Sequence, residues 1–367
     1  MEFNESEEQN IKFYTAEHVF YNPHMELSRT LSSLLAGSLG EKLFILDGMA
    51  ASGIRGMRYK KENKNVEKVA FVDVYDAAVE CIKKGIKENG IRAEVFREDI
   101  NRFLFNATNE YNFIELDPFG TPTPHVYFAV RALRNLKSGY LSITATDTAV
   151  LCGAHKKACL KNYHSRPMRN YFCHETGLRI LINYIARIAH EFNFGIKPLL
   201  SFYYRHQMKT IIRLEKGAEK ADENLRQMGY VSFCPKCLNA TSGKTMEKTC
   251  SICGKENDFA GELWLGEIND KKMIKKMLGL NEKRKYESRE QVERFLSLIE
   301  EELSIPYFFD THGIAKAYGK MPPKTEKMVK LLKKHGFEGS RTHFSPTGFK
   351  TDASIKEIVS LLAGRNV

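Results

Sequence analysis

The sequence predicts an α/β protein built on a parallel sheet, with a cysteine-bearing insertion and a smaller basic C-terminal part. Three observations support this prediction. Short apolar runs alternate with helical stretches from residue 43 onward, an aspartate follows each of the first four runs, and the character of the chain changes after Gly229. Strands that alternate with helices are typical of βαβ units and a Rossmann-like sheet.

The elements of this sheet can be placed in order along the chain. The expected strands cover residues 43–46, 69–72, 92–97, 113–116 and 140–146. Three helices are expected. The first begins at Ile54, the second covers 77–89 with Gly90 as C-cap, and the third covers 177–192. A late hairpin is expected from the apolar segments 199–204 and 209–214.

The second half of the chain has a different organisation. Segments 230–233 and 263–268 flank the cysteine-bearing loop, and we expect them to be paired strands of the main sheet. A charged helical stretch over 270–284 leads into a basic part with an amphipathic helix over 325–334. We therefore expect one domain over 1–268, with an insertion at 234–253, and a smaller α+β domain over 269–367.

Charge is concentrated at the C-terminal end. The net charge is +11, and residues 269–367 contribute +7 of it, with 20 Lys and Arg against 13 Asp and Glu. A basic module favours a polyanionic partner such as a nucleic acid, although a solvated charged surface is the alternative. No apolar run approaches the ~18 residues of a membrane span, and the acidic N-terminus does not resemble a signal peptide. We expect a cytoplasmic protein with no membrane partner.

Four aspartates mark the carboxyl ends of the first four predicted strands. They are Asp47, Asp73, Asp99 and Asp117. Open α/β sheets bind ligands at this edge, and a buried charge without a partner is costly. We therefore interpret the four acids as parts of a binding site.

The second and third acids suit a nucleoside. Asp73 lies about 26 residues past the first turn, where an acid can accept hydrogen bonds from both ribose hydroxyls. Asp99 and the backbone of Ile100 would suit adenine, with the carboxylate on the exocyclic amine and the N–H on a ring nitrogen. An empty Rossmann-like core is the alternative.

The first turn favours an amino acid group over a pyrophosphate. Residues 47–56 do not form the Gly-x-Gly-x-x-Gly pattern, and Asp47 would repel phosphate but attract an ammonium group. Arg55, and Arg29 from the segment before the sheet, can hold a carboxylate through paired hydrogen bonds. This combination favours S-adenosylmethionine over a dinucleotide.

The segment Asp117-Pro118-Phe119-Gly120 places an acid and an aromatic ring together at a strand end. Such a pair suits a planar base with an exocyclic amine, because the ring can stack on it while the acid accepts its N–H. Phe20 or Tyr21 could supply a second stacking face. A simple turn is the alternative for the tetrapeptide, and a core position is the alternative for Phe20.

Four cysteines have the spacing of a zinc site. Cys234, Cys237, Cys250 and Cys253 form the pattern C-x2-C-x12-C-x2-C, in which four thiolates can complete a tetrahedral structural site for Zn²⁺. Two disulfides are the alternative, which a reducing cytoplasm disfavours. The remaining four cysteines have no ligand spacing.

Several of these motifs together resemble a known family. The tRNA (guanine-26 N2) dimethyltransferase family, and its archaeal members in particular, is similar in residues 20–23, Arg29, 47–56, 117–122, 341–344 and 350–352. The resemblance covers nearly the whole chain. It implies a class I S-adenosylmethionine-dependent methyltransferase domain, a C-terminal domain particular to the family, and transfer of one or two methyl groups to guanine N2 of tRNA.

The resemblance also implies roles for individual residues. Arg29, Arg55, Asp73, Asp99 and Ile100 are expected to contact the cofactor, and Asp47 is added on physical grounds alone. The guanine is expected to be held by Phe20, Asp117 and Phe119.

Other functions remain open from the sequence. The basic segment 155–167 follows the fifth strand and could meet phosphates near the target base, or form a solvated loop. The alternatives are a methyltransferase for the amine of another RNA or DNA base, and a non-catalytic RNA-binding zinc protein. We expect a monomer that binds tRNA.

Overall fold

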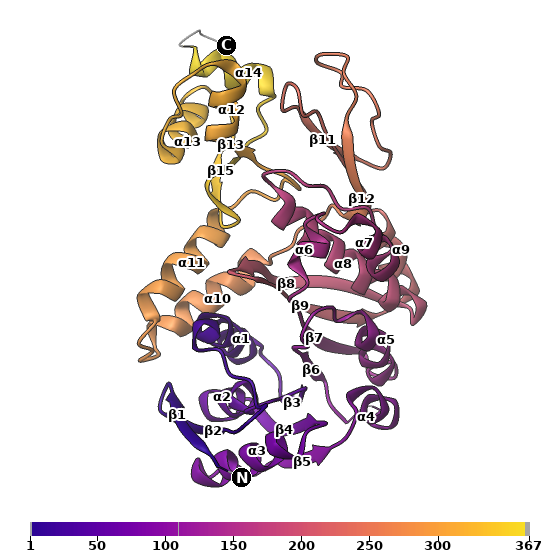
Figure 1. Ribbon diagram of the computed structural model, residues 1–367, viewed down its shortest axis with the longest axis vertical. Coiled ribbons are helices and arrows are strands. Elements are labelled where there is room, and N and C mark those ends of the chain that lie inside the picture. Colours follow the sequence, from indigo (N-terminus) through magenta and orange to yellow (C-terminus); the bar gives the residue numbers. More distant parts are fainter. Residues whose placement is uncertain (1, 109, 364–367) are drawn as a thin grey trace.

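A computed structural model describes residues 2–108 and 110–363 and contains a central seven-stranded sheet with helices on both faces (Figure 1). The sheet order is β5 (Glu94–Arg97), β4 (Val66–Asp73), β3 (Leu43–Gly48), β6 (Phe113–Leu116), β7 (Ser138–Ala145), β9 (Gln207–Lys216) and β8 (Phe194–Tyr204). The first five strands are parallel, and β9 is antiparallel to both of its neighbours. The five predicted strands and the late hairpin are thus confirmed.

Helices cover the sheet in two layers. One face packs against α1 (Glu26–Ser38), α2 (Ile54–Glu62), α3 (Asp76–Glu88) and α10 (Lys271–Glu282). The other face packs against α4 (Ile100–Asn106), α5 (Thr123–Ala132) and α8 (Cys173–Glu191). Successive side chains of β4 face opposite layers: Val69 and Phe71 pack in the core on one face of the sheet, and Ala70 and Val72 pack in the core on the other.

Shorter helices connect or cover the end of the sheet. Between β7 and α8 the chain forms α6 (Thr148–Leu151) and α7 (Lys156–Tyr163), and α9 (Ala218–Leu225) packs on the edge strand β8. Before α1, the chain forms an antiparallel hairpin of β1 (Asn4–Glu8) and β2 (Ile11–Thr15), then a short 3-10 helix, η1 (Pro23–Met25). This hairpin was not predicted from the sequence.

The strands that flank the cysteine loop form a sheet of their own. Strands β11 (Ala240–Gly243), β10 (Met228–Phe233) and β12 (Asp258–Trp264) are antiparallel, in that order. The predicted pairing of the flanking segments is confirmed, but their placement in the main sheet is wrong. The reason is that β12 packs on α8 instead, where Arg179 donates to the carbonyl oxygens of Trp264 and Gly266 at 3.0 and 2.9 Å.

The C-terminal part has two components. A three-stranded sheet of β13 (Phe309–Asp310), β15 (Ser345–Lys350) and β14 (Ser340–Thr342) packs with α12 (Thr311–Tyr318), α13 (Thr325–Lys334) and α14 (Ile355–Leu362). Helix α10 and the following α11 (Arg289–Glu301) instead share a core with α1. The predicted domain division between residues 268 and 269 stays a prediction.

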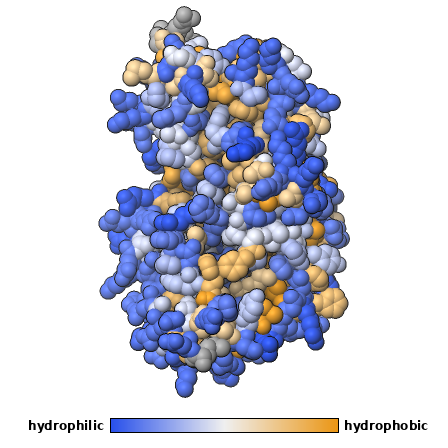
Figure 2. Space-filling view, viewed as in Figure 1, coloured by the Kyte–Doolittle hydropathy of each residue, from blue (hydrophilic) through white to orange (hydrophobic). Residues whose placement is uncertain are grey.

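The face of the molecule drawn in Figure 2 is mainly hydrophilic. Figure 2 shows a group of hydrophobic residues on the visible face, at about the height at which Figure 1 places β3, β6 and β7. Within the described residues, none of the helices combines the length and the apolar character needed to cross a membrane.

Candidate functional site

The sheet brings the four predicted acids to one edge. Asp47 lies near the end of β3, Asp73 ends β4, Asp99 immediately precedes α4 after β5, and Asp117 follows β6. These four strands are consecutive neighbours in the sheet. The acids therefore lie in a row at the carboxyl edge, where a ligand of an open α/β sheet is expected.

Asp73 organises the turn after β3. Its Oδ2 accepts the N–H of Ala51 at 2.9 Å and its Oδ1 accepts the N–H of Tyr75 at 3.0 Å. The turn contains left-handed residues at Met49, Ala51 and Gly53, with φ of 60°, 49° and 72°. Non-glycine residues in this conformation are uncommon and cluster at functional sites. Each carboxylate oxygen still has lone-pair capacity for a ribose hydroxyl.

Asp99 and Ile100 lie at the beginning of α4. Asp99 is exposed and caps the helix, because its Oδ1 accepts the N–H of Arg102 at 3.0 Å. Ile100 is the first helical residue, a position whose N–H has no partner within a helix. The positions thus offer a carboxylate and a backbone donor side by side, and their contact with adenine stays a prediction.

Asp47 is buried and turned toward α2. Its Oδ2 accepts the N–H of Gly56 at 2.8 Å, and its side chain is only 3% exposed. Burial, followed by the nearby charge of Glu115, raises its pKa to about 8. The carboxyl group is therefore mainly neutral at pH 7, which weakens the attraction for an ammonium group that the sequence analysis proposed.

Asp117 is paired with Arg55. Nη2 of Arg55 donates to Oδ2 of Asp117 at 2.6 Å, and the Asp117 side chain is 31% exposed. Burial acts to raise the pKa of Asp117, but the charges of Arg55 and Lys209 outweigh it, so that the pKa lies below its ordinary value. Arg55 therefore faces the predicted substrate acid, whereas the sequence analysis assigned it to the cofactor carboxylate, an assignment that stays a prediction.

A buried ion pair that the sequence analysis missed lies beneath this contact. Glu115 of β6 and Lys209 of β9 are fully buried and bonded to each other. Tyr59 donates to Oε2 of Glu115 at 2.7 Å, and Lys209 donates to Oγ1 of Thr144 at 2.9 Å. The available signal was the presence of charged residues within otherwise apolar strands.

Arg29 lies under the N-terminal hairpin. Its Nε donates to both carboxylate oxygens of Glu8, at 2.8 and 3.0 Å, and its Nη2 donates to the carbonyl oxygen of Asn22 at 3.1 Å. Nη1 of Arg58 also donates to Glu8, at 2.8 Å. Arg29 thus anchors the segment that carries Phe20, and its predicted contact with a cofactor carboxylate would compete with Glu8.

Two exposed aromatic rings meet at the edge of the sheet. Phe20 is 50% exposed and Phe119 is 76% exposed, and their ring centroids lie 4.8 Å apart at an interplanar angle of 78°. The structure therefore brings the two predicted stacking residues together. The alternative aromatic, Tyr21, is directed inward, where its hydroxyl donates to Glu8 at 3.1 Å.

The four predicted cysteine ligands converge at one point. Their sulfur atoms all lie within 4.8 Å of one another, with 3.5 Å between Cys234 and Cys253 and 3.5 Å between Cys237 and Cys250. Four sulfurs ~2.3 Å from one zinc ion would lie ~3.8 Å apart. All four cysteines are free thiols rather than disulfides. The cluster therefore fits a structural zinc ion, which would join the two turns of this sheet.

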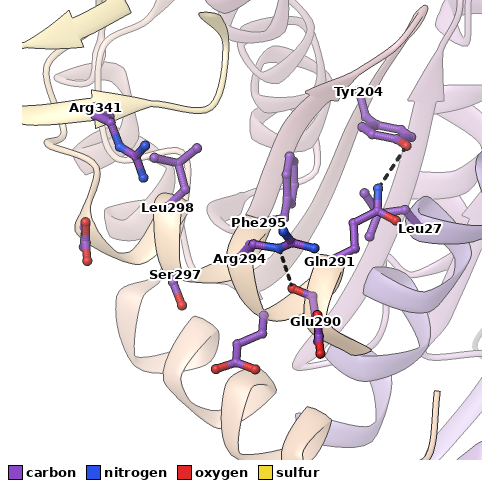
Figure 3. Close-up of a pocket in the computed structure, with 11 residues that line it drawn as sticks. Leu27, Tyr204, Glu290, Gln291, Arg294, Phe295, Ser297, Leu298 and Arg341 are labelled. Carbon is purple, nitrogen blue, oxygen red and sulfur yellow. Dashed lines mark hydrogen bonds between the residues drawn. The ribbon is translucent and has the colours of Figure 1, made fainter. Parts of the chain in front are cut away.

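Two hollows are lined by residues outside both the sheet-edge site and the cysteine cluster. One, of about 700 Å³, lies between α1, the end of β8, α11 and Arg341, and Figure 3 shows Gln291 directed toward Tyr204 across it. The other, of about 730 Å³, is lined by Lys156 and Lys157 of the predicted phosphate segment and by Arg169, which lies just beyond it. None of the predicted catalytic or cofactor residues lines either hollow.

A family model and the similar known proteins all point to the same family. A family model described as N2,N2-dimethylguanosine tRNA methyltransferase matches residues 2–363. The tRNA (guanine(26)-N(2))-dimethyltransferase of Methanothermobacter thermautotrophicus is 38% identical over 354 residues, which cover 94% of this chain and 93% of that protein. The enzyme of the same name from Pyrococcus abyssi is 35% identical over 361 residues, covering 94% and 93%.

The fold leads to the same family. A solved structure of Trm1 from Pyrococcus horikoshii with S-adenosyl-L-methionine superposes with a TM-score of 0.89, at 33% identity, and covers 98% of this chain and 99% of that one. The match extends over the main sheet, the cysteine-bearing sheet and the C-terminal part. This chain belongs to the tRNA (guanine(26)-N(2))-dimethyltransferase family.

Proposed function

We propose that this protein transfers methyl groups from S-adenosylmethionine to the exocyclic N2 of guanosine 26 in tRNA, first one and then a second. The observation that carries the proposal is the grouping of Asp117, Phe119 and Phe20 at the carboxyl edge of the sheet, with the row of acids beside it. The names of the relatives and of the similar structure support the substrate and the methyl donor.

The donor fits the remaining residues of this edge. S-adenosylmethionine, when bound, supplies a methyl group on a positively charged sulfur. Asp73 would accept the ribose hydroxyls, and Asp99 with the N–H of Ile100 would hold the adenine. Arg29, Arg55 and Asp47 are the proposed partners of its amino acid end, although each has an internal partner in the structure.

Asp117 would orient the reacting nitrogen. The amine of guanine is a weak nucleophile because its lone pair is delocalised into the ring, and positive charge develops on it during transfer. An ionised carboxylate that accepts one N–H fixes the amine and stabilises this charge. The lowered pKa of Asp117 keeps the group ionised at neutral pH, so orientation rather than strong basicity is its proposed contribution.

Phe20 and Phe119 would hold the flipped base. The target guanine must leave its stack to reach this edge. A base between two parallel rings needs them ~7 Å apart, twice an ordinary carbon contact, whereas the rings here are 4.8 Å apart and nearly perpendicular. We infer that at least one ring rotates when the base enters.

The tRNA would be held by basic surfaces on both parts of the molecule. The residues that line the second hollow, among them Lys156, Lys157 and Arg169, follow β7 in the chain, and β7 is the neighbour of β6, which Asp117 follows. Residues 269–367 add a net charge of +7. We propose that residues 1–268 form the catalytic domain and 269–367 the tRNA-binding domain of a monomer. A reducing cytoplasm suits the eight free cysteines.

The test is transfer of labelled methyl groups from S-adenosylmethionine to unmodified tRNA, followed by nucleoside analysis. We expect N2-methylguanosine and N2,N2-dimethylguanosine at position 26. Methylation of another base, or no transfer by protein that binds the donor, would contradict the proposal in favour of one of the two alternatives, a different base specificity or a non-catalytic RNA-binding protein.

The matched variant is Asp117→Asn, which keeps the size of the side chain. We expect the rate to fall by about 10²- to 10⁴-fold while S-adenosylhomocysteine still binds. Asp76→Asn, at an exposed position on α3 that pairs with Arg97, serves as the control and should transfer at the normal rate. Normal turnover by the Asp117 variant would remove this residue from the mechanism.

A further inference from the structure

Two fully buried charged residues lie directly behind the proposed catalytic acid. Glu115 precedes Asp117 by two positions, so both side chains project from the same face of the extended segment. Lys209 lies on β9, opposite Thr144 of β7, and reaches across β7 to Glu115. Both side chains of this pair are 0% exposed.

Arg55 lies between the two carboxylates. Its Nη2 donates to Oδ2 of Asp117 at 2.6 Å, whereas its Nε lies 3.7 Å from Oε1 of Glu115, beyond hydrogen-bond distance. Oε1 is the same oxygen that accepts from Lys209. Arg55 and Lys209 therefore face one oxygen of Glu115, and only Lys209 is bonded to it.

We propose that Lys209 and Glu115 are positioning residues for methyl transfer. Lys209 supplies the charged hydrogen-bond donor that the buried Glu115 needs, so Arg55 remains bonded to Asp117. The proposal rests on the proposed function of Asp117. An unpaired charge in the interior is costly, so loss of Lys209 would draw the guanidinium the remaining ~1 Å toward Glu115. Asp117 would then lose the bond that fixes its orientation toward the amine.

The charge balance of the site favours this arrangement. Three acids, Asp47, Glu115 and the partly exposed Asp117, lie beside two buried bases, Arg55 and Lys209. The pKa of Asp47, raised to about 8 by burial and by Glu115, leaves this carboxyl group mainly neutral, so Glu115 and Asp117 are the two carboxyl groups that face the two bases. Without Lys209, the two acids would compete for one guanidinium.

The experiment compares the variant Lys209→Met with a double variant that also carries Glu115→Gln. The measured quantity is kcat for methyl transfer per bound S-adenosylhomocysteine, counted by calorimetry, so that unfolded protein does not contribute. We expect kcat of Lys209→Met to fall about 10- to 100-fold, as for a misplaced catalytic group. The double variant should recover to within about threefold of the wild type, since the neutral amide no longer competes for Arg55.

A second buried pair in the same chain provides a matched control. Arg179 donates to Oε1 of Glu175 at 2.9 Å, both side chains are 0% exposed, and Glu175 also accepts from Lys350 at 2.7 Å. Arg179→Met thus removes a buried base whose acid keeps a second base, as Lys209→Met does, and neither Asp117 nor Arg55 is among the partners of Arg179. We expect its kcat per bound ligand to stay at the wild-type value.

The outcomes separate this proposal from the proposed function. Normal kcat in folded Lys209→Met, or a double variant as slow as the single one, overturns the positioning role. Absence of guanosine methylation by the wild type overturns the proposed function instead. Should Lys209→Met fail to fold, Lys209→Gln, which keeps a donor but no charge, takes its place with the same expected and overturning results.

Discussion

At the scale of single residues, the site combines an ionised acid with two surface aromatic rings. Asp117 is held from behind by Arg55, while Phe119 next to it is 76% exposed. Because most of the Phe119 ring is in solvent, packing within the protein stabilises it little. Its position on the surface is better explained by binding of a ligand.

Phe119 gives a prediction at this scale. Base stacking is worth about 1–3 kcal/mol, so Phe119→Ala should reduce kcat/KM for tRNA about 5- to 150-fold, and Phe119→Tyr should retain most of it. The measurement is steady-state methyl transfer at varied tRNA. Phe105→Ala, which removes another half-exposed ring on α4, is the control, and an equal loss in that variant would contradict a stacking role.

The sequence predicted the acids of the edge but not the groups behind them. Asp73, Asp99 and Asp117 follow recognisable strand ends, so a local pattern was sufficient. Glu115 and Lys209 are 94 positions apart, and their pairing depends on the order of β6, β7 and β9 in the folded sheet. Only a three-dimensional structure reveals such a partner.

At the scale of elements, one glutamate bonds the N-terminal hairpin to two helices that cover the main sheet. Glu8 ends β1 and accepts from Arg29 of α1 and Arg58 of α2. All three side chains are nearly or fully buried. The hairpin therefore fixes the segment that carries Phe20, although no sequence pattern predicted these strands.

Glu8 gives a prediction with a definite pH dependence. Burial acts to raise the pKa of Glu8, but Arg29 and Arg58 outweigh it and lower the pKa. The stabilisation is therefore present above the unfolded value of ~4.3 and is lost as pH falls through the lower folded pKa. Glu8→Gln should lower the free energy of unfolding by about 3–5 kcal/mol at pH 7, and less at acidic pH. Chemical denaturation at several pH values measures this difference.

The exposed neighbour Glu7 supplies the control for that prediction. Glu7→Gln changes the same charge on the same strand without removing a partner of Arg29 or Arg58. Its free energy of unfolding should stay within about 0.5 kcal/mol of the wild type. A pH-independent loss in Glu8→Gln would mean that the ionised form of Glu8 is not what stabilises the hairpin.

The cysteine-bearing sheet gives a prediction about metal content. The purified protein should contain about one zinc ion per chain, and Cys237→Ser should lose it and unfold at a lower temperature. Metal analysis and thermal unfolding check the two effects. Cys81→Ala, on α3 and away from the cluster, should keep its zinc. A folded wild-type protein without metal would contradict the assignment.

At the scale of the whole molecule, the cysteine-bearing sheet is joined to the C-terminal part by a direct contact. The hydroxyl of Tyr318 on α12 donates to the carbonyl oxygen of Cys237 at 2.8 Å. Figure 1 shows the strands β11 and β12 beside the C-terminal helices, at the end of the molecule opposite α3. The sequence did not predict where this sheet packs, because strand pairing is visible in a sequence pattern and the surface against which the strands pack is not.

The distribution of charge gives a prediction about tRNA affinity. Lys157 and Lys161 are exposed on α7, beside the basic hollow. Replacing both with alanine should weaken tRNA binding and reduce the slope of log affinity against log salt by about one for each lost phosphate contact. Titrations at several salt concentrations measure the slope.

The control for this prediction removes the same charge elsewhere. Lys83 and Lys87 are exposed on α3, and their replacement with alanine should leave the salt slope unchanged. Equal slopes in the two double variants would show that α7 has no particular contact with tRNA phosphates.

The contact between Phe20 and Phe119 has a consequence for base selection. The two rings already share an aromatic interaction, worth about 0.5–1.5 kcal/mol, which an incoming base must replace. Only the difference between base stacking, about 1–3 kcal/mol, and this contact is available as net affinity. A pyrimidine offers less surface than a purine and recovers less of that cost. In the proposed site, the closed ring pair would thus discriminate against pyrimidines before Asp117 forms a hydrogen bond to the base.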